Sequence, residues 1–167
     1  MLKIVGAKGN ISNVDKFLKK VESFAKSKNI VIQAFNADMI FGKNHIVSAY
    51  EHATRSIKNK KNTTNSLEME LLLYSSGERQ LKLAIPKMGV KNGRGGIVFV
   101  LIGNNISSII IDELLSFFSL EKDNKLIDGN VDTLIQFGLK DEEIKTVKKD
   151  KYENLILEKV ALVDIIK

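Results

Sequence analysis

The sequence predicts an α/β (α+β) fold in which several helices cover a small mixed sheet, all within one compact domain that spans residues 1–167. β-rich segments alternate with segments of helical periodicity along the whole chain. The run Ile97–Ile102 is apolar without a break, which is typical of a strand buried on both faces, and we expect it at the centre of the sheet. With 44% hydrophobic and 28% charged residues, a chain of this length can bury one core without disulfides or metals.

The first third of the chain predicts two strands and two helices. Ser12 with Asp15 three residues later resembles a capping box, and apolar residues then recur at helical spacing. A second helix follows a short β-rich segment and carries His45, His52 and Arg55 on the face opposite its apolar residues. The expected elements are a strand at 2–5 that ends at Gly6, a helix at 13–28, a strand at 30–35 and a helix at 43–58.

The rest of the chain is predicted to be mainly helical. Asn65 with Glu68 favours the start of a helix that Ser75 and Gly77 close. Ser75 with Glu78 favours the next one, which Pro86 shortens or kinks. The segment Gly89–Gly96 is expected to be a flexible basic loop before the central strand. The remaining expected elements are helices at 106–120, 131–137 and 141–149 and a final apolar element at 152–166.

Positive charge is concentrated before Ile97. Up to Gly96 there are 17 Lys/Arg against 7 Asp/Glu, giving +10, and from Ile97 onward 9 against 13, giving −4, which together make the net charge of +6. Such clusters are typical of proteins that bind phosphate-rich partners, although surface lysines can also serve only solvation. The candidate phosphate-binding residues are Arg55, Lys58, Lys60, Lys61, Arg79, Lys82, Lys87, Lys91 and Arg94.

The residues that usually carry catalysis are absent or badly spaced. Without cysteine, thiolate metal sites and cysteine nucleophiles are excluded, and a cytoplasmic location fits. His45 and His52 lie seven residues apart, roughly 10.5 Å along a helix, which is too far to bind one metal ion; His45 is expected to cap or pack near the start of its helix. The glycines at 89–96 precede a strand rather than a helix, unlike a phosphate-binding loop. We therefore expect no catalytic residue, no metal, no cofactor and no membrane span.

Two segments are apolar on most sides when drawn as helices, namely 106–118 and 155–166. Such a helix is either deeply buried or docked to another protein. The candidate partner-binding residues are Ile109, Leu114, Phe117, Phe118, Ile165 and Ile166.

A string of residues in the middle of the chain resembles a known family. It begins with Asn36, His45, Ala49, Ala53 and Arg55, continues through Glu70-Leu71-Leu72-Leu73-Tyr74-Ser75-Ser76-Gly77-Glu78-Arg79-Gln80-Leu81, and closes with Ala84-Ile85 and Gly89. This pattern is similar to that of the small tRNA-binding subunit of the KEOPS complex, the TPRKB-like family. Pro86 and the lysine-rich loop 58–61 depart from it.

The resemblance implies a non-catalytic subunit. KEOPS makes the threonylcarbamoyl modification of adenosine 37 in tRNA, and this subunit binds the complex's kinase-like ATPase subunit and, in archaea, captures tRNA including its CCA end. The basic residues could form a groove if the helices that hold Arg55 and Arg79 are neighbours. Tyr50, Tyr74 and the arginine guanidinium planes are candidates for stacking on unpaired bases, and Tyr74 fits the core equally well. Two alternatives stay open: a protein-binding regulator of a kinase-like partner without RNA contact, and a small enzyme acting on an anionic metabolite near His45 or His52.

Overall fold

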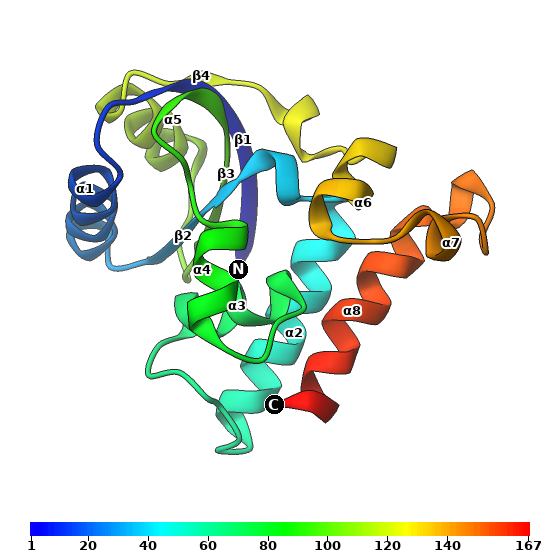
Figure 1. Ribbon diagram of the computed structural model, residues 1–167. Helices are drawn as coiled ribbons and strands as arrows, with labels where there is room; N and C mark the ends of the chain where they lie inside the picture. The colour runs from blue at the N-terminus through cyan, green and yellow to red at the C-terminus, as the bar shows by residue number, and fades with distance from the viewer. The chain divides into compact units, whose positions relative to one another are not determined.

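The computed structural model describes residues 1–167, and the chain forms two compact units (Figure 1). The first unit consists of Met1–Ala37 and Val90–Ile127, and the second of Asp38–Gly89 and Asp128–Lys167. Each unit is therefore built from two separate stretches of the chain. The expectation of one domain over residues 1–167 stays a prediction.

The first unit contains a four-stranded sheet. Its strands are β1 (Leu2–Ile11), β2 (Val31–Asn36), β3 (Gly93–Ile102) and β4 (Glu121–Lys122), in the order β2-β3-β1-β4. The α+β class and the central place of the strand ending at Ile102 are confirmed. The expectation of a mixed sheet is wrong, because every pairing is antiparallel. β1 and β2 run in the same direction, but β3 lies between them and runs opposite to both, so no parallel pair forms.

Glycines lengthen two strands beyond their expected ends. Gly6 does not end β1: a Cβ there would lie 2.3 Å from the carbonyl oxygen of Asp123, so its missing side chain leaves room for the neighbouring segment. The expected loop at 89–96 is partly strand, since Gly93 pairs with Ile11 and Gly96 with Lys8. At Gly6 and Gly96 a neighbouring segment lies where a side chain would be, so glycine fits the strand at these two positions.

Two helices cover one face of this sheet, α1 (Val14–Lys28) and α5 (Ser108–Phe117). The helix expected at 13–28 is confirmed, with Asn13 rather than Ser12 as its N-cap, since the Asn13 side chain accepts from the backbone N–H of Lys16. Phe17 of α1, Phe99 of β3 and Leu114 of α5 meet in the core between these layers. A 3₁₀ turn, η2 (Asn124–Ile127), follows β4.

The second unit is helical. Its helices are α2 (Gly42–Lys58), α3 (Leu67–Ser76), α4 (Leu81–Met88), α6 (Val131–Phe137), α7 (Asp141–Ile144) and α8 (Tyr152–Ile166), with 3₁₀ turns η1 (Ala37–Met39) at the boundary and η3 (Lys149–Lys151) before α8. α2 packs against α3 and α8, and α3 also contacts α4 and α8. The helices expected at 43–58, 131–137 and 152–166 are confirmed, whereas the one at 141–149 ends at Ile144. No helix has both the length and the apolar character that crossing a bilayer requires.

Candidate functional site

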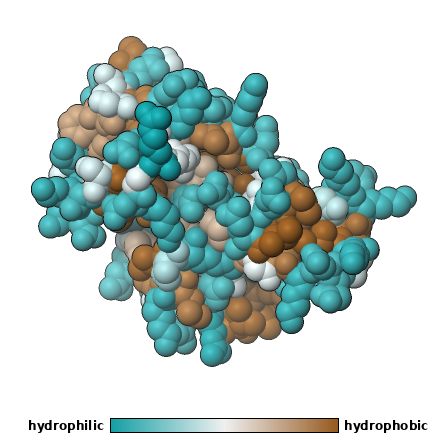
Figure 2. Space-filling model, turned by 45° about the horizontal axis from the view of Figure 1, so that its top comes forward, coloured by the Kyte–Doolittle hydropathy of each residue, from teal (hydrophilic) through white to brown (hydrophobic).

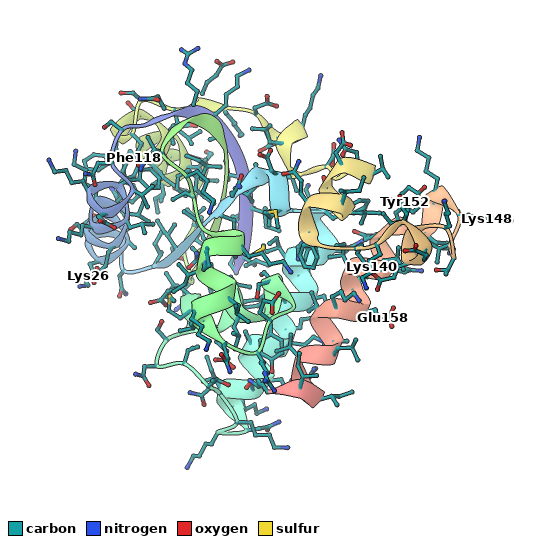
Figure 3. The ribbon with its side chains drawn as sticks, viewed as in Figure 1. Lys26, Phe118, Lys140, Lys148, Tyr152 and Glu158 are labelled. Carbon is teal, nitrogen blue, oxygen red and sulfur yellow. The ribbon has the colours of Figure 1, made fainter.

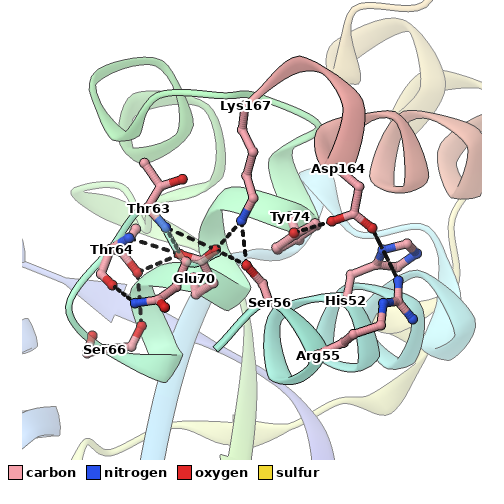
Figure 4. Close-up of polar contacts among 11 residues, drawn as sticks. His52, Arg55, Ser56, Thr63, Thr64, Ser66, Glu70, Tyr74, Asp164 and Lys167 are labelled. Carbon is pink, nitrogen blue, oxygen red and sulfur yellow. Dashed lines mark hydrogen bonds and ion pairs between the residues drawn. The ribbon is translucent and has the colours of Figure 1, made fainter. Parts of the chain in front are cut away.

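A network of polar side chains ties α2, α3 and α8 together at one end of the second unit (Figure 4). At its centre lies the fully buried carboxylate of Glu70. Lys167 Nζ is 2.5 Å from Oε1, and the Ser56 hydroxyl donates to the same oxygen at 3.2 Å. The backbone N–H groups of Thr63 and Thr64 donate to Oε2 at 3.1 and 3.0 Å, and the Thr64 hydroxyl donates to it at 2.8 Å. One carboxylate therefore joins two helices and a loop.

The pKa values of this ion pair follow from its hydrogen bonds. Burial alone would raise the pKa of Glu70, but hydrogen bonds from Lys167 and Thr64 outweigh it and hold that pKa below the ordinary value. Burial alone would lower the pKa of Lys167, and its contacts with Glu70 and Tyr74 raise it instead. Both groups stay charged in the folded protein. Each is the counter-ion that the other needs, since a buried charge without a partner is strongly destabilising.

The loop between α2 and α3 is held at both of its ends. At the start, Lys60 adopts a left-handed conformation with φ 56°, and the backbone N–H of Lys61 donates to the Ser56 carbonyl at 2.9 Å. At the far end, Thr63 and Thr64 bind Glu70 as described above. We call residues 58–61 the lysine loop. Backbone hydrogen bonds therefore hold the chain both within this loop and just after it. The exposed cationic side chains of the lysine loop are those of Lys58, Lys60 and Lys61.

A second set of contacts surrounds Asp164 of α8. The Tyr74 hydroxyl donates to one carboxylate oxygen, while His52 Nδ1 and the Arg55 guanidinium lie 2.6 and 3.2 Å from the other. Burial favours a raised pKa for Asp164, and the hydrogen bonds from Tyr74, His52 and Arg55 overcome this and keep the pKa below its ordinary value. The His52 ring also stacks on Tyr74, with centroids 5.5 Å apart. Because its guanidinium pairs with the Asp164 carboxylate, the charge of Arg55 is partly neutralised, although 53% of its side chain is exposed.

The two sets of contacts involve the same two helices, α3 and α8. Glu70 and Tyr74 are four residues apart on α3, and Asp164 and Lys167 are three apart at the end of α8, so each pair lies on one side of its helix. The Glu70–Lys167 ion pair and the Tyr74–Asp164 hydrogen bond hold α8 against α3; we call these two contacts the clamp. Glu70 is not among the site residues predicted from the sequence; the spacing of glutamate and tyrosine within the family-like string was the available signal. Tyr74 is fully buried, so its expected role as a stacking surface for RNA bases is wrong.

His45 is a structural residue near the start of α2. The backbone N–H of Phe41 donates to its Nδ1 at 3.1 Å, so Nε2 carries the proton and donates to the Ser75 carbonyl at 2.8 Å. Burial lowers the pKa of His45 to about 4, which keeps the ring neutral. The expected packing near the helix start is confirmed, while its expected place on the polar face is wrong because the side chain is fully buried. With both nitrogens occupied, His45 offers no free catalytic base.

Lys87 of α4 is committed to contacts within the second unit. Its Nζ donates to the Ser76 carbonyl at 2.7 Å and to Glu78 at 3.2 Å, and it lies 3.9 Å from the centroid of the Phe137 ring. Burial lowers the pKa of Lys87, and the charge of Glu78 opposes that shift. This lysine supports the packing of α3, α4 and α6 rather than presenting its charge to solvent, so the structure does not favour the predicted phosphate contact.

The other candidate cations divide between the two units. Arg79 and Lys82 are exposed on either side of the start of α4. α2 and α4 each pack against α3, and the convergence of Arg55 with Arg79 stays a prediction. Lys91 and Arg94 are exposed but belong to the first unit. Together with the lysine loop, the second unit thus presents most of the predicted cationic set.

The candidate partner-binding residues also separate into exposed and buried ones. Ile109 and Phe117 of α5 are exposed, and so are Ile165 and Ile166 of α8, with Ile165 at 77%. Leu114 is fully buried in the core of the first unit, so its assignment to a partner surface is wrong.

Phe118, labelled in Figure 3, follows α5 and is half-buried. Its ring centroid lies 4.7 Å from that of Phe17. It is therefore mainly a packing residue. Apolar patches interrupt the polar face shown in Figure 2. The exposed apolar residues that sequence reasoning missed include Leu83, Ile85, Val131, Ile135 and Leu162.

Comparison with known proteins gives two matches. A family model described as "Kinase binding protein CGI-121" matches residues 9–164, a range that takes in segments of both units. The regulatory protein Cgi121 of Methanocaldococcus jannaschii is 31% identical over 139 residues, which cover 80% of this chain and 83% of that relative.

Proposed function

Because this chain belongs to the CGI-121 family of kinase binding proteins, we propose that it is a non-catalytic adaptor subunit of a KEOPS complex. In this role it binds tRNA, including the CCA end, and the kinase-like ATPase subunit, and it supports threonylcarbamoyladenosine formation at position 37. The family match supports the kinase partner. The tRNA role rests on the sequence resemblance and on the charges described next. A cytoplasmic location is part of the same proposal.

The lysine loop is the observation that carries the RNA-binding part. Lys58, Lys60 and Lys61 are exposed, and none of them forms an ion pair. Neither the lysine loop nor residues 62–65 that follow it contain a carboxylate, so no acidic residue in this segment offsets the three positive charges. Such a segment suits the phosphates of RNA, because each neutralised phosphate releases condensed counterions. Arg79, Lys82, Lys91 and Arg94 are proposed as further phosphate contacts.

Arg55 is proposed to act beside the lysine loop. Its guanidinium bonds Asp164, but more than half of the side chain is open to solvent, so its remaining donors can reach a phosphate. Unpaired bases of the CCA end need flat surfaces, and the exposed guanidinium planes of Arg55 and Arg79 supply them.

Filter binding of a tRNA transcript at low ionic strength tests this proposal. The variant with Lys60→Glu and Lys61→Glu should lose most of its affinity. The matched control, Lys148→Glu with Lys149→Glu, changes the same charge at two adjacent exposed lysines of the same unit, outside the loop (Figure 3 shows Lys148), and should retain binding. Equal loss in both variants, or no retention of tRNA by the unaltered protein, would refute specific binding by the loop.

The exposed apolar end of α8 is proposed to contact the kinase-like subunit. Ile165 and Ile166 lie on its last turn, where an apolar side chain in water favours a partner. In co-purification of the two subunits, Ile165→Glu should weaken the kinase-like partner's retention while tRNA binding persists. Kinase binding by a protein that ignores tRNA would instead favour a regulator without RNA contact.

A further inference from the structure

The buried ion pair lies next to the loop that carries the exposed lysines. We propose that Lys167 and Glu70 are positioning residues for RNA binding: the last turn of α8 fixes the conformation of the lysine loop through the Glu70 carboxylate. This inference rests on the proposed tRNA-binding function of that loop. It adds a role for two residues that cannot themselves touch RNA.

The hydrogen bonds define a continuous path from α8 to the loop (Figure 4). Lys167 Nζ bonds Glu70 Oε1, and Glu70 Oε2 accepts from the backbone N–H groups of Thr63 and Thr64. The remaining hydrogen bonds of the segment are local, such as the one from Asn62 Nδ2 to the Thr64 carbonyl at 2.8 Å. The far end of the loop is therefore held to the helices through the Glu70 carboxylate.

Lys167 cannot act as a phosphate contact. Only 7% of its side chain is exposed, its Nζ also donates to the Ser56 hydroxyl at 2.7 Å, and it lies 4.6 Å from the centroid of the Tyr74 ring. Its ammonium group forms an ion pair with Glu70, which is fully buried and has no other cation within ion-pair distance. Removing Lys167 leaves a buried carboxylate without a counter-ion, and that carboxylate then becomes protonated or draws in water. Either change weakens its hold on Thr63 and Thr64.

The primary test is hydrogen exchange in the variant Lys167→Met. The amides of Thr63 and Thr64 should exchange roughly tenfold faster or more, since a hydrogen bond to a charged group is lost. Amides in α1 should keep their protection. Lys167→Arg should preserve the slow exchange because it retains the charge. Lys151→Met removes one exposed charge from the same unit and should leave the exchange of the loop unchanged.

The second readout is tRNA affinity over a range of salt concentrations. In Lys167→Met, affinity should fall severalfold with an unchanged slope of log K against log salt, because no phosphate contact is removed. Lys60→Glu should make that slope shallower, by about one unit per lost contact. A slope change in Lys167→Met equal to that in Lys60→Glu would overturn the positioning role.

The two readouts separate failure of this inference from failure of the proposed function. If the unaltered protein does not bind tRNA, the proposed function fails. Unchanged exchange at Thr63 and Thr64, or faster exchange with full tRNA affinity, overturns the positioning role alone. Should Lys167→Met fail to fold, the double variant Glu70→Leu with Lys167→Met removes both charges together, leaves no unpaired ion and removes the acceptor of the Thr63 and Thr64 N–H groups. That variant must show the same fast exchange and weakened tRNA binding, and retention of both properties would contradict the inference.

Discussion

At the scale of single residues, burial decides what the two histidines do. His45 is enclosed and binds two backbone groups, whereas His52 is partly open and bonds Asp164. The sequence places both on one helix at a spacing unsuited to a shared metal, which agrees with these separate roles. It does not reveal that His45 faces inward, because the Ser75 carbonyl that its ring binds lies 30 residues away along the chain.

His45 predicts a pH dependence of stability between pH 6.5 and about pH 4. Its pKa is about 4 in the folded protein against an ordinary 6.5, so the unfolded chain binds the proton more readily. Keeping His45 neutral therefore adds to the free energy of unfolding. This contribution is fully present above pH 6.5 and is lost as pH falls toward 4, by about 3 kcal/mol in total. Urea unfolding from pH 7 to pH 5 should show the decline. His45→Gln should flatten it while His52→Gln keeps the contribution of His45; an unchanged slope in His45→Gln would contradict this assignment.

At the scale of secondary structure, the attachment of α8 to α3 organises the second unit. Predicting α8 itself needed only apolar spacing, and its bounds agree with the expected 152–166. Its attachment could not be predicted, because the Tyr74 and Asp164 side chains are 90 residues apart in sequence. The same limit applies to the strands. Gly6 and the 93–96 segment indicate turns locally, and only the strand pairing and the close approach of neighbouring segments at Gly6 and Gly96 show that the strands continue there.

The clamp predicts that Tyr74→Phe destabilises the protein. The substitution keeps the buried ring but removes the hydroxyl that donates to Asp164, at an expected cost of about 1–3 kcal/mol for a hydrogen bond to a charged group. The midpoint of urea unfolding should fall accordingly. Tyr50→Phe, on α2 and only half-buried, is the matched control and should change the midpoint little. Equal stability of Tyr74→Phe and the unaltered protein would show that the contact contributes nothing.

The carboxylates of the clamp predict a second loss of stability in acid. Glu70 and Asp164 have folded pKa values below their ordinary 4.5 and 3.8, so the stability they contribute is present above those values. It is lost as pH falls through the lowered pKa values, because the unfolded chain then binds more protons. The double variant Glu70→Gln with Lys167→Met should reduce this acid-dependent loss, as measured by thermal unfolding between pH 5 and pH 3. A loss equal to that of the unaltered protein would exclude Glu70 as a source.

At the scale of the whole molecule, the distribution of positive charge and the family match support a protein that binds RNA and a kinase-like partner. The predicted cations fall in both units, and those of the lysine loop are exposed and without ion pairs. Their identity was readable from sequence because a run of lysines needs no fold to be noticed. The internal roles of Lys87 and Arg55 were not readable, since their partners come from other elements. The family match gives the kinase-binding character, and the charges give the RNA-binding proposal.

The most direct test of that account is the affinity of the isolated protein for a tRNA transcript across a series of salt concentrations. We predict that log K falls linearly with log salt, and that the slope becomes shallower by about two units when Lys60 and Lys61 are both changed to glutamate. Absence of binding at the lowest salt, or a slope that the double variant leaves unchanged, would contradict the claim that the lysine loop binds RNA phosphates.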